Sequence, residues 1–152
     1  MTKRIEPRFY FDSIDWTVKQ YHLMVKAGLL EENQRVELLY GKIIPINPVG
    51  RFHAACVSNL QEYFILRLQK QFTYRTQDPV AILDDTEPEP DFVIAKRDEE
   101  NYLSGHPEAE DIIVLMEVSD TTLEKDKRFK LHIYAEAKVR EYWIINLVER
   151  QI

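Results

Sequence analysis

The feature that most constrains the fold is an apolar run over residues 112–118 that has a glutamate near its end. Residues 112–116 are two isoleucines, a valine, a leucine and a methionine, and Glu117 and Val118 come directly after them. A nearly continuous apolar run of this length is typical of a strand that is buried on both faces. An unpaired carboxylate in such a strand would be costly, so we expect Glu117 to be paired with a cation, bound to a metal, or protonated.

The composition is that of an ordinary globular domain. The chain has 152 residues, of which 45% are hydrophobic and 30% are charged, and we expect a single domain over 1–152. Its abrupt end after Ile152 leads us to expect that one or more C-terminal strands are missing. No apolar run approaches the roughly 18 residues of a membrane helix, and the N-terminus lacks the apolar segment of a signal peptide. Together with the single cysteine, Cys56, this predicts a cytoplasmic protein without a membrane partner.

The charge of the chain limits how it could bind nucleic acid. A net charge of −6 at pH 7 does not favour a strong nucleic-acid binder, because phosphate contacts supply much of the affinity. It does not exclude a nuclease, since a metal site gathers carboxylates whose charge the bound cations offset. Such an enzyme needs a basic patch, and each candidate patch is alternatively a solvated charged face. The two candidates are Arg67, Lys70 and Arg75, and then Lys125, Lys127, Arg128 and Lys130.

The first part of the chain predicts a short helix followed by a hairpin. Thr17 and Gln20 have the spacing of a capping box, so a helix is expected near 17–27. Two β-rich runs within 35–46 are separated by a tyrosine and a glycine, and this predicts a β-hairpin. Pro45 would fit best on an edge strand, because proline cannot donate a ladder hydrogen bond.

The rest of the chain predicts a long helix, three strands, a second helix and a final strand. Apolar residues recur at helical spacing in the first of these elements, and His53 falls on the same face. A helix between the last two strands predicts a mixed sheet flanked by helices. In the second helix Phe129 and Ile133 are expected to face inward. The elements are a helix over 51–70 (with Val57, Leu60, Phe64 and Leu68), strands near 73–83, 92–95 and 112–118, a helix from a capping box at Thr121 and Glu124 to about 137, and a strand over 141–147.

Asp91 and Glu117 are the strongest candidates for chemistry. Asp91 precedes one predicted strand and Glu117 ends the next, so antiparallel pairing would bring both carboxylates to one edge of the sheet. Such oxygen ligands suit Mg²⁺, which takes one or two carboxylates together with waters and substrate phosphate. The metal would lower the pKa of a bound water and offset charge on the phosphate. The residues alone leave an alternative open, in which Asp91 caps the turn after Pro90 and Glu117 pairs with a lysine.

At these residues the sequence resembles a known family. Pro90-Asp91 with Glu117-Val118-Ser119 is similar to the PD-(D/E)XK signature of restriction-endonuclease-like nucleases. Nearly the whole chain resembles the Uma-two family of candidate restriction endonucleases. The resemblance implies an α/β fold with an αβββαβ nuclease core, Mg²⁺ or Mn²⁺ as cofactor and DNA as substrate. The matching segments are 35–43, Gly50 with His53, 89–91, 117–119, Asp126 with Lys130, 134–135 and 141–144.

The resemblance also assigns roles to individual residues. It implies that Asp91 and Glu117 are metal ligands. Ser119 stands where the signature has its lysine, and in this family the lysine has moved to the following helix, which here means Lys130. A lysine near the metal would orient the attacking water or stabilise the charge that develops on the phosphate. The alternative for Lys130 is an i,i+4 ion pair with Asp126.

Further residues have one interpretation from the family and another from the sequence alone. Glu37 would hold a second metal or a water, whereas the strand pattern alone favours an outward-facing glutamate. His53 is either a core histidine or a residue at the edge of the active site that carries a proton or contacts phosphate. Tyr134 and Trp143 are expected to pack in the core or at its rim. Lys138 stands where the family has a glycine in a left-handed helix cap.

The sequence leaves three functions open. The first is a metal-dependent phosphodiesterase acting on DNA, and the presence of Asp91, Glu117 and Lys130 together favours it. The second is a catalytically silent nuclease-fold domain that serves as a binding or assembly module. The third is a metal-free structural α/β protein, which would need another partner for the buried glutamate. Because nuclease-fold domains often pair to cut two strands, a homodimer is also expected.

Overall fold

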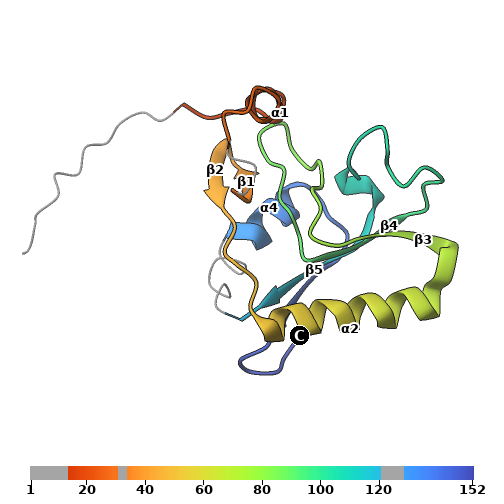
Figure 1. Ribbon diagram of the computed structural model, residues 1–152. Coiled ribbons are helices and arrows are strands. Elements are labelled where there is room, and N and C mark those ends of the chain that lie inside the picture. The colour runs from red at the N-terminus through yellow and green to blue at the C-terminus, as the bar shows by residue number, and fades with distance from the viewer. Residues whose placement is uncertain (1–13, 31–33, 121–128) are drawn as a thin grey trace, which may run out of the picture.

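A four-stranded mixed sheet forms the centre of the computed structural model, which describes residues 14–30, 34–120 and 129–152 (Figure 1). The first three strands along the sheet are antiparallel neighbours, whereas the last runs parallel to the third. This arrangement confirms the predicted mixed sheet. The strands lie in the order β3 (Phe72–Arg75), β4 (Phe92–Lys96), β5 (Ile112–Ser119) and β6 (Tyr142–Asn146).

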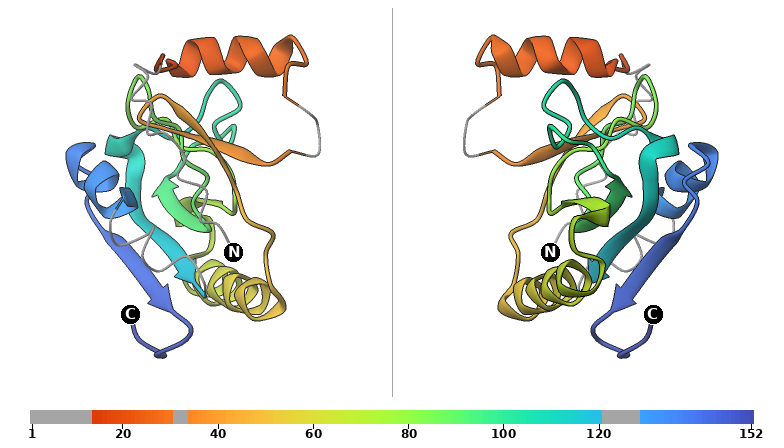
Figure 2. Two further views of the ribbon diagram at one scale, coloured as in Figure 1. Left: turned by 90° about the vertical axis from the view of Figure 1, so that its left-hand side faces the viewer. Right: turned by 90° about the vertical axis from the view of Figure 1, so that its right-hand side faces the viewer.

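Two helices cover opposite faces of this sheet: α2 (Arg51–Leu68) and α4 (Leu131–Glu136) (Figure 2). Along β4, Phe92 packs in the apolar cluster beside α2, and Val93 packs in the cluster beside α4. This alternation follows from the two-residue period of a strand. The order α2, β3, β4, β5, α4, β6, with the short 3-10 helix η2 (Ala109–Asp111) before β5, confirms the expected αβββαβ core.

The predicted amphipathic face of α2 is the face that packs on the sheet. Val57 is buried there, and three further apolar residues at helical spacing pack partly buried against the same cluster: Leu60, Phe64 and Leu68. His53 lies at the N-terminal end of this face, and the 3-10 helix η1 (Gln69–Gln71) follows the helix. No helix within the three described ranges is long and apolar enough to cross a membrane.

The N-terminal helix α1 (Val18–Lys26) begins and ends at the predicted residues. Thr17 accepts a hydrogen bond from the backbone N–H of Gln20, whose side chain in turn accepts one from the backbone N–H of Thr17. This reciprocal arrangement satisfies two N–H groups that a helix start leaves without partners. Gly28 follows the helix with φ of 68°, a conformation that glycine adopts without steric cost.

Strands β1 (Val36–Leu39) and β2 (Lys42–Pro45) form the predicted hairpin, and both faces of β1 are covered. Leu38 packs with Tyr21 of α1, and Leu39 packs in the α4-side cluster of the main sheet. Every residue of β1 is therefore buried. Pro45 ends β2, which pairs only with β1 within the part of the chain described, so the predicted edge position is confirmed.

The strand predicted near 73–83 is much shorter than expected. It ends at Arg75, because the backbone of Gln77 turns into the left-handed region with φ of 53° and Pro79 has no N–H to donate. The N–H of Gln77 instead donates to the carbonyl of Pro90 at 3.1 Å. The bend brings Gln77 beside the start of β4.

The helix predicted to end near 137 is confirmed in its C-terminal part, while the capping box at Thr121 and Glu124 lies outside the described residues. Ile133 is fully buried as expected, but Phe129 is 60% exposed, so the inward orientation predicted for Phe129 is wrong. The inward face contains Lys130, Ile133 and Tyr134 at i, i+3 and i+4. Lys130 therefore faces inward, where the hydrophobic pattern had predicted Phe129.

Candidate functional site

Asp91 and Glu117 meet at one edge of the central sheet. In the antiparallel pairing of β4 with β5, Phe92 lies opposite Met116. Asp91 precedes the first of these residues and Glu117 follows the second, so the two carboxylates face the same edge. Both residues are buried, with 9% and 4% of their surface exposed. The pairing on which the predicted convergence depended is therefore confirmed.

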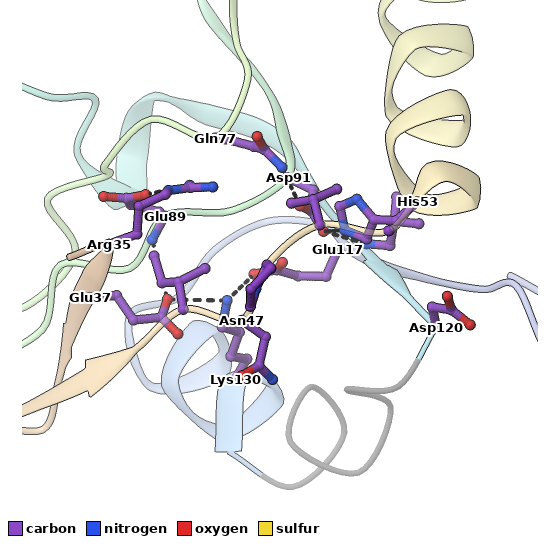
Figure 3. A pocket seen from close by; sticks show the side chains of 15 residues that line it. Arg35, Glu37, Asn47, His53, Gln77, Glu89, Asp91, Glu117, Asp120 and Lys130 are labelled. Carbon is purple, nitrogen blue, oxygen red and sulfur yellow. Dashed lines mark hydrogen bonds and ion pairs between the residues drawn. The ribbon is translucent and has the colours of Figure 1, made fainter. Parts of the chain in front are cut away.

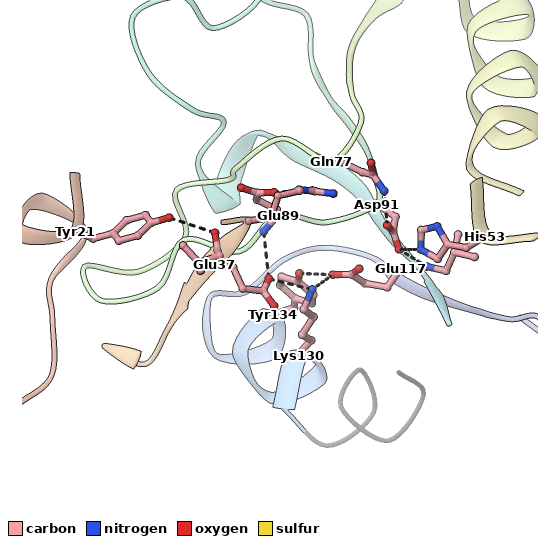
Figure 4. Close-up of polar contacts among 12 residues, drawn as sticks. Tyr21, Glu37, His53, Gln77, Glu89, Asp91, Glu117, Lys130 and Tyr134 are labelled. Atoms are coloured by element: carbon pink, nitrogen blue, oxygen red, sulfur yellow. Dashed lines mark hydrogen bonds and ion pairs between the residues drawn. The ribbon is translucent and has the colours of Figure 1, made fainter. Parts of the chain in front are cut away.

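Glu117 has two hydrogen-bond donors from the helix that covers its face of the sheet. Lys130 places its Nζ 2.7 Å from Glu117 Oε1, and the Tyr134 hydroxyl donates to the same oxygen at 2.9 Å (Figure 4). Burial, followed by the negative charge of Glu117, raises the pKa of Tyr134 well above its usual value. The hydroxyl therefore keeps its proton and donates. These contacts offset the cost of a buried carboxylate.

Lys130 connects Glu117 with a second buried carboxylate. Its Nζ also lies 3.2 Å from Glu37 Oε2, and the side chains of Lys130 and Glu37 are 6% and 1% exposed. The outward-facing orientation considered for Glu37 is therefore wrong, because α1 and the main sheet cover the two faces of β1. The alternative pair of Lys130 with Asp126 falls outside the described residues.

Glu37 is fixed at the hairpin side of the site. Its Oε2 accepts a hydrogen bond from the backbone N–H of Glu89 at 3.4 Å, and the Glu89 carboxylate accepts one from Arg35 at 2.8 Å. Burial raises the pKa of the nearby Tyr21, and the charges of Glu89, Glu87 and Glu37 raise it further. Carboxylates therefore gather on this side of the site, where a bound cation would offset their charge.

Asp91 is held by three donors from three different segments. Its Oδ2 accepts from the N–H of Val118 at 2.8 Å and lies 2.9 Å from Nε2 of His53, while Oδ1 accepts from the side-chain amide of Gln77 at 3.3 Å. Burial alone would raise the pKa of Asp91, but the hydrogen bonds from His53 and Val118 outweigh it, and the pKa is lowered. Asp91 is thus an ionised, oriented carboxylate at neutral pH.

One pocket brings these side chains together (Figure 3). His53 lies at its edge with 13% of its side chain exposed, which matches the edge position and not that of a core histidine. Mg²⁺ prefers oxygen ligands and takes one or two carboxylates with waters, so Asp91 and Glu117 fit this ion as donors. The pocket is lined by Glu37, His53, Asp91, Glu117 and Lys130, and also by polar residues that include Arg35, Asn47, Gln77, Glu89 and Asp120.

The structure adds two residues to the predicted set and leaves one basic patch outside it. Tyr134 was expected to pack only, although its spacing four residues after Lys130 already placed both on one helix face. Gln77 gave no sequence signal, because its position depends on the bend after β3. Trp143 packs partly buried beside α2, as expected.

The basic group at the end of α2 does not line the pocket. Arg67 lies about 20 Å along the helix from His53, at 1.5 Å per residue, and its guanidinium covers the ring of Tyr63 at 3.7 Å. Arg75 pairs with Asp78 at 3.1 Å. In the second basic group, Lys130 lies in the pocket, whereas 125, 127 and 128 fall outside the described ranges.

Comparison with known proteins finds a matching family and a similar fold. A family model described as "Uma2: Putative restriction endonuclease" matches residues 18–152. Among solved structures, the chain is similar to the "crystal structure of a putative nuclease belonging to DUF820" from Anabaena variabilis, with a TM-score of 0.57 and 17% identity. The likeness covers 86% of this chain and 73% of that chain, and at this identity it shows the fold alone. A comparison with curated proteins finds no match.

Proposed function

This chain belongs to the family described as "Putative restriction endonuclease", and from that membership we propose that it is a metal-dependent endonuclease that hydrolyses phosphodiester bonds in DNA. The observation that supports this most is the buried group around Lys130. Its Nζ lies 2.7 Å from Glu117, which itself faces Asp91 across two adjacent strands. Carboxylates and a lysine around one pocket are groups that a metal-dependent hydrolase would use.

We assign the metal to Asp91 and Glu117. A bound Mg²⁺ or Mn²⁺ supplies a Lewis acid and a water of lowered pKa. Val118 and His53 keep Asp91 ionised and oriented toward the pocket, and Tyr134 holds Glu117 in place. Carboxylates that are fixed in this way can bind a cation without first reorganising.

Lys130 would act on the reacting groups, and Glu37 would position it. An ammonium group in a buried pocket can orient a water or stabilise charge that develops on a phosphate oxygen. Glu37 lies on the other side of Lys130 at 3.2 Å, so it fixes the direction of the lysine, and it offers a second position for a metal or a water. His53, at the edge of the pocket, would contact the phosphate or carry a proton.

The proposal is tested by metal titration together with DNA cleavage. Calorimetric titration with Mg²⁺ and Mn²⁺, and nicking of a supercoiled plasmid, would be measured for wild type, Asp91→Asn and Glu117→Gln. Glu99→Gln is the control, because its side chain is 86% exposed. We expect metal-dependent nicking that falls by at least about 10- to 100-fold in both pocket variants and stays unchanged in the control.

Two outcomes would contradict it. A wild-type chain that binds neither metal has no such site. A chain that binds metal through Asp91 and Glu117 but leaves DNA uncut would be the silent nuclease-fold module. Cleavage of a matched RNA in place of the plasmid would correct the substrate class. The homodimer and the cytoplasmic location stay predictions.

A further inference from the structure

A second group of metal-binding side chains lies apart from the pocket. His22 comes from α1, Glu87 from the turn before β4, and His106 from the loop before η2. Each offers one ligand atom, and these atoms all lie within 4.8 Å of one another. None of the three lines the pocket around Asp91.

Glu87 is the fixed member of this group. Its side chain is 3% exposed, and its backbone exchanges hydrogen bonds with Leu38 of β1 at 2.8 Å and 3.3 Å. His22 Nε2 lies 2.8 Å and 3.0 Å from the two carboxylate oxygens of Glu87. The His22 side chain is 51% exposed, so its ring has room to turn.

The ion pair of His22 with Glu87 does not explain the position of His106. Its ring lies 6.4 Å from that of His22, centre to centre, with the planes 73° apart. Its Nδ1 is buried and has no hydrogen-bond partner among the described residues. A pair of His22 with Glu87 would satisfy those two residues and would leave His106 with an unused nitrogen. Buried ring nitrogens are normally hydrogen-bonded or bound to a metal.

We propose that His22, Glu87 and His106 form a binding site for a divalent transition metal, with Zn²⁺ as the ion that fits best. Two imidazoles and one carboxylate are a known ligand set for Zn²⁺, and the fourth position of the tetrahedron is left to a water. Imidazole ligands favour Zn²⁺ and its neighbours in the first transition row, whereas a site built from carboxylates favours Mg²⁺. The two sites of this chain therefore select different metals.

The geometry requires a small closure around the ion. Zinc ligands lie about 2.0–2.2 Å from the metal, so the ligand atoms must approach one another from their present separations, and the contact of His22 with Glu87 must open to admit the ion. The exposed His22 ring can make this movement while the buried Glu87 stays in place.

A metal at this position would cross-link three segments of the fold. It would join α1 to the turn at Glu87 and to the loop at His106, which are distant in sequence. An ion that binds only the folded chain stabilises it by mass action. The inference does not depend on the nuclease proposal, since it uses other residues and another class of metal.

The experiment uses the whole chain, stripped with EDTA and dialysed. It is titrated with Zn²⁺ by calorimetry and with Co²⁺ by visible absorption, which reports tetrahedral coordination. Variants His22→Ala and His106→Ala are compared with His132→Ala, an exposed histidine on α4, and with His53→Ala in the other pocket. We expect one tight Zn²⁺ site, an affinity about 100-fold lower in the first two variants, and an unchanged tight site in the last two.

Two results would overturn the inference. Either the wild type binds Zn²⁺ no more tightly than the His22→Ala and His106→Ala variants do, or His53→Ala removes the tight site, which would assign the ion to the pocket of Asp91. Circular dichroism of each variant excludes misfolding as the cause of a loss. A rise of the wild-type melting temperature with Zn²⁺ that is absent in His106→Ala supplies a second readout.

Discussion

Replacing Lys130 by methionine should destabilise the metal-free protein strongly. Methionine keeps most of the apolar stem but removes the ammonium group, which lies 2.7 Å from Glu117 and 3.2 Å from Glu37. All three side chains are nearly inaccessible to water. The substitution would therefore leave two buried carboxylates without the cation that lies between them.

The expected magnitude follows from this burial. Removing one partner of a buried ion pair typically costs about 3–5 kcal/mol, because the remaining charge stays desolvated. The free energy of unfolding of a whole domain is about 5–15 kcal/mol, so the loss would be a large part of it. Mg²⁺ should restore part of the stability, since the cation proposed to bind Asp91 and Glu117 again offsets the charge of Glu117. At 100 times its dissociation constant, a ligand stabilises the folded state by about 2.7 kcal/mol.

Urea unfolding, followed by tryptophan fluorescence in EDTA and then in Mg²⁺, measures this effect. Lys96→Met is the control, because Lys96 also pairs with a carboxylate, that of Asp111 at 3.3 Å, but is 54% exposed. Its loss should change the free energy of unfolding by less than about 1 kcal/mol. Combining Lys130→Met with Glu117→Gln should cost less than the sum of the two single changes. If Lys130→Met and Lys96→Met cost the same, the account of a buried, coupled group is wrong.

Two further predictions concern the carboxylates separately. Tyr134→Phe removes the hydroxyl that donates to Glu117 at 2.9 Å. It should lower the free energy of unfolding in EDTA by about 1.5–3 kcal/mol, as measured by urea unfolding. An unchanged free energy would mean that this hydrogen bond does not stabilise the fold. Because the pKa of Asp91 is lowered from 3.8, its ionised form stabilises the fold above about pH 4, and this stabilisation is lost as the pH falls through the folded-state pKa. Asp91→Asn should therefore flatten the acid side of the stability curve in EDTA, and an unchanged curve would contradict the assignment.

Local signals in the sequence predicted most of the fold, because those signals depend on short-range physics. The capping box at Thr17, the helical spacing over 51–70 and the apolar run over 112–118 each determine an element from neighbouring residues. Lys138 adopts the left-handed conformation that the family's glycine at this position implied, with φ of 60°. The order of these elements then left few ways to build the sheet.

The errors occur where a distant part of the chain decides the outcome. The strand near 73–83 looked continuous, but it ends at Arg75 because the next residues hydrogen-bond to the segment before β4. Phe129 is more hydrophobic than Lys130, yet the lysine faces inward because two buried carboxylates lie there. The local sequence pattern predicts neither result.

The site shows the same division. The convergence of Asp91 and Glu117 was predicted on the condition that the two strands pair antiparallel, and they do. The burial of Glu37 could not, because it requires α1 on one face of β1 and the main sheet on the other. The sequence of one strand does not show whether its second face contacts solvent or another element. A glutamate in a short β-rich run is ambiguous until the elements that cover it are known.

In the proposed nuclease, Lys130 would take the part of the lysine that the strand signature has at the position of Ser119. Residues 117 and 119 lie on the same face of β5, since side chains alternate along a strand. A lysine at Ser119 would therefore extend from the face that carries Glu117. Helix α4 packs on that face, and from it Lys130 brings its ammonium group to the same carboxylate. The ammonium group thus reaches Glu117 from the helix and not from the strand. Its position depends on how α4 packs and on Glu37 from the hairpin. The hairpin is in this way part of the candidate site, although it lies outside the nuclease core.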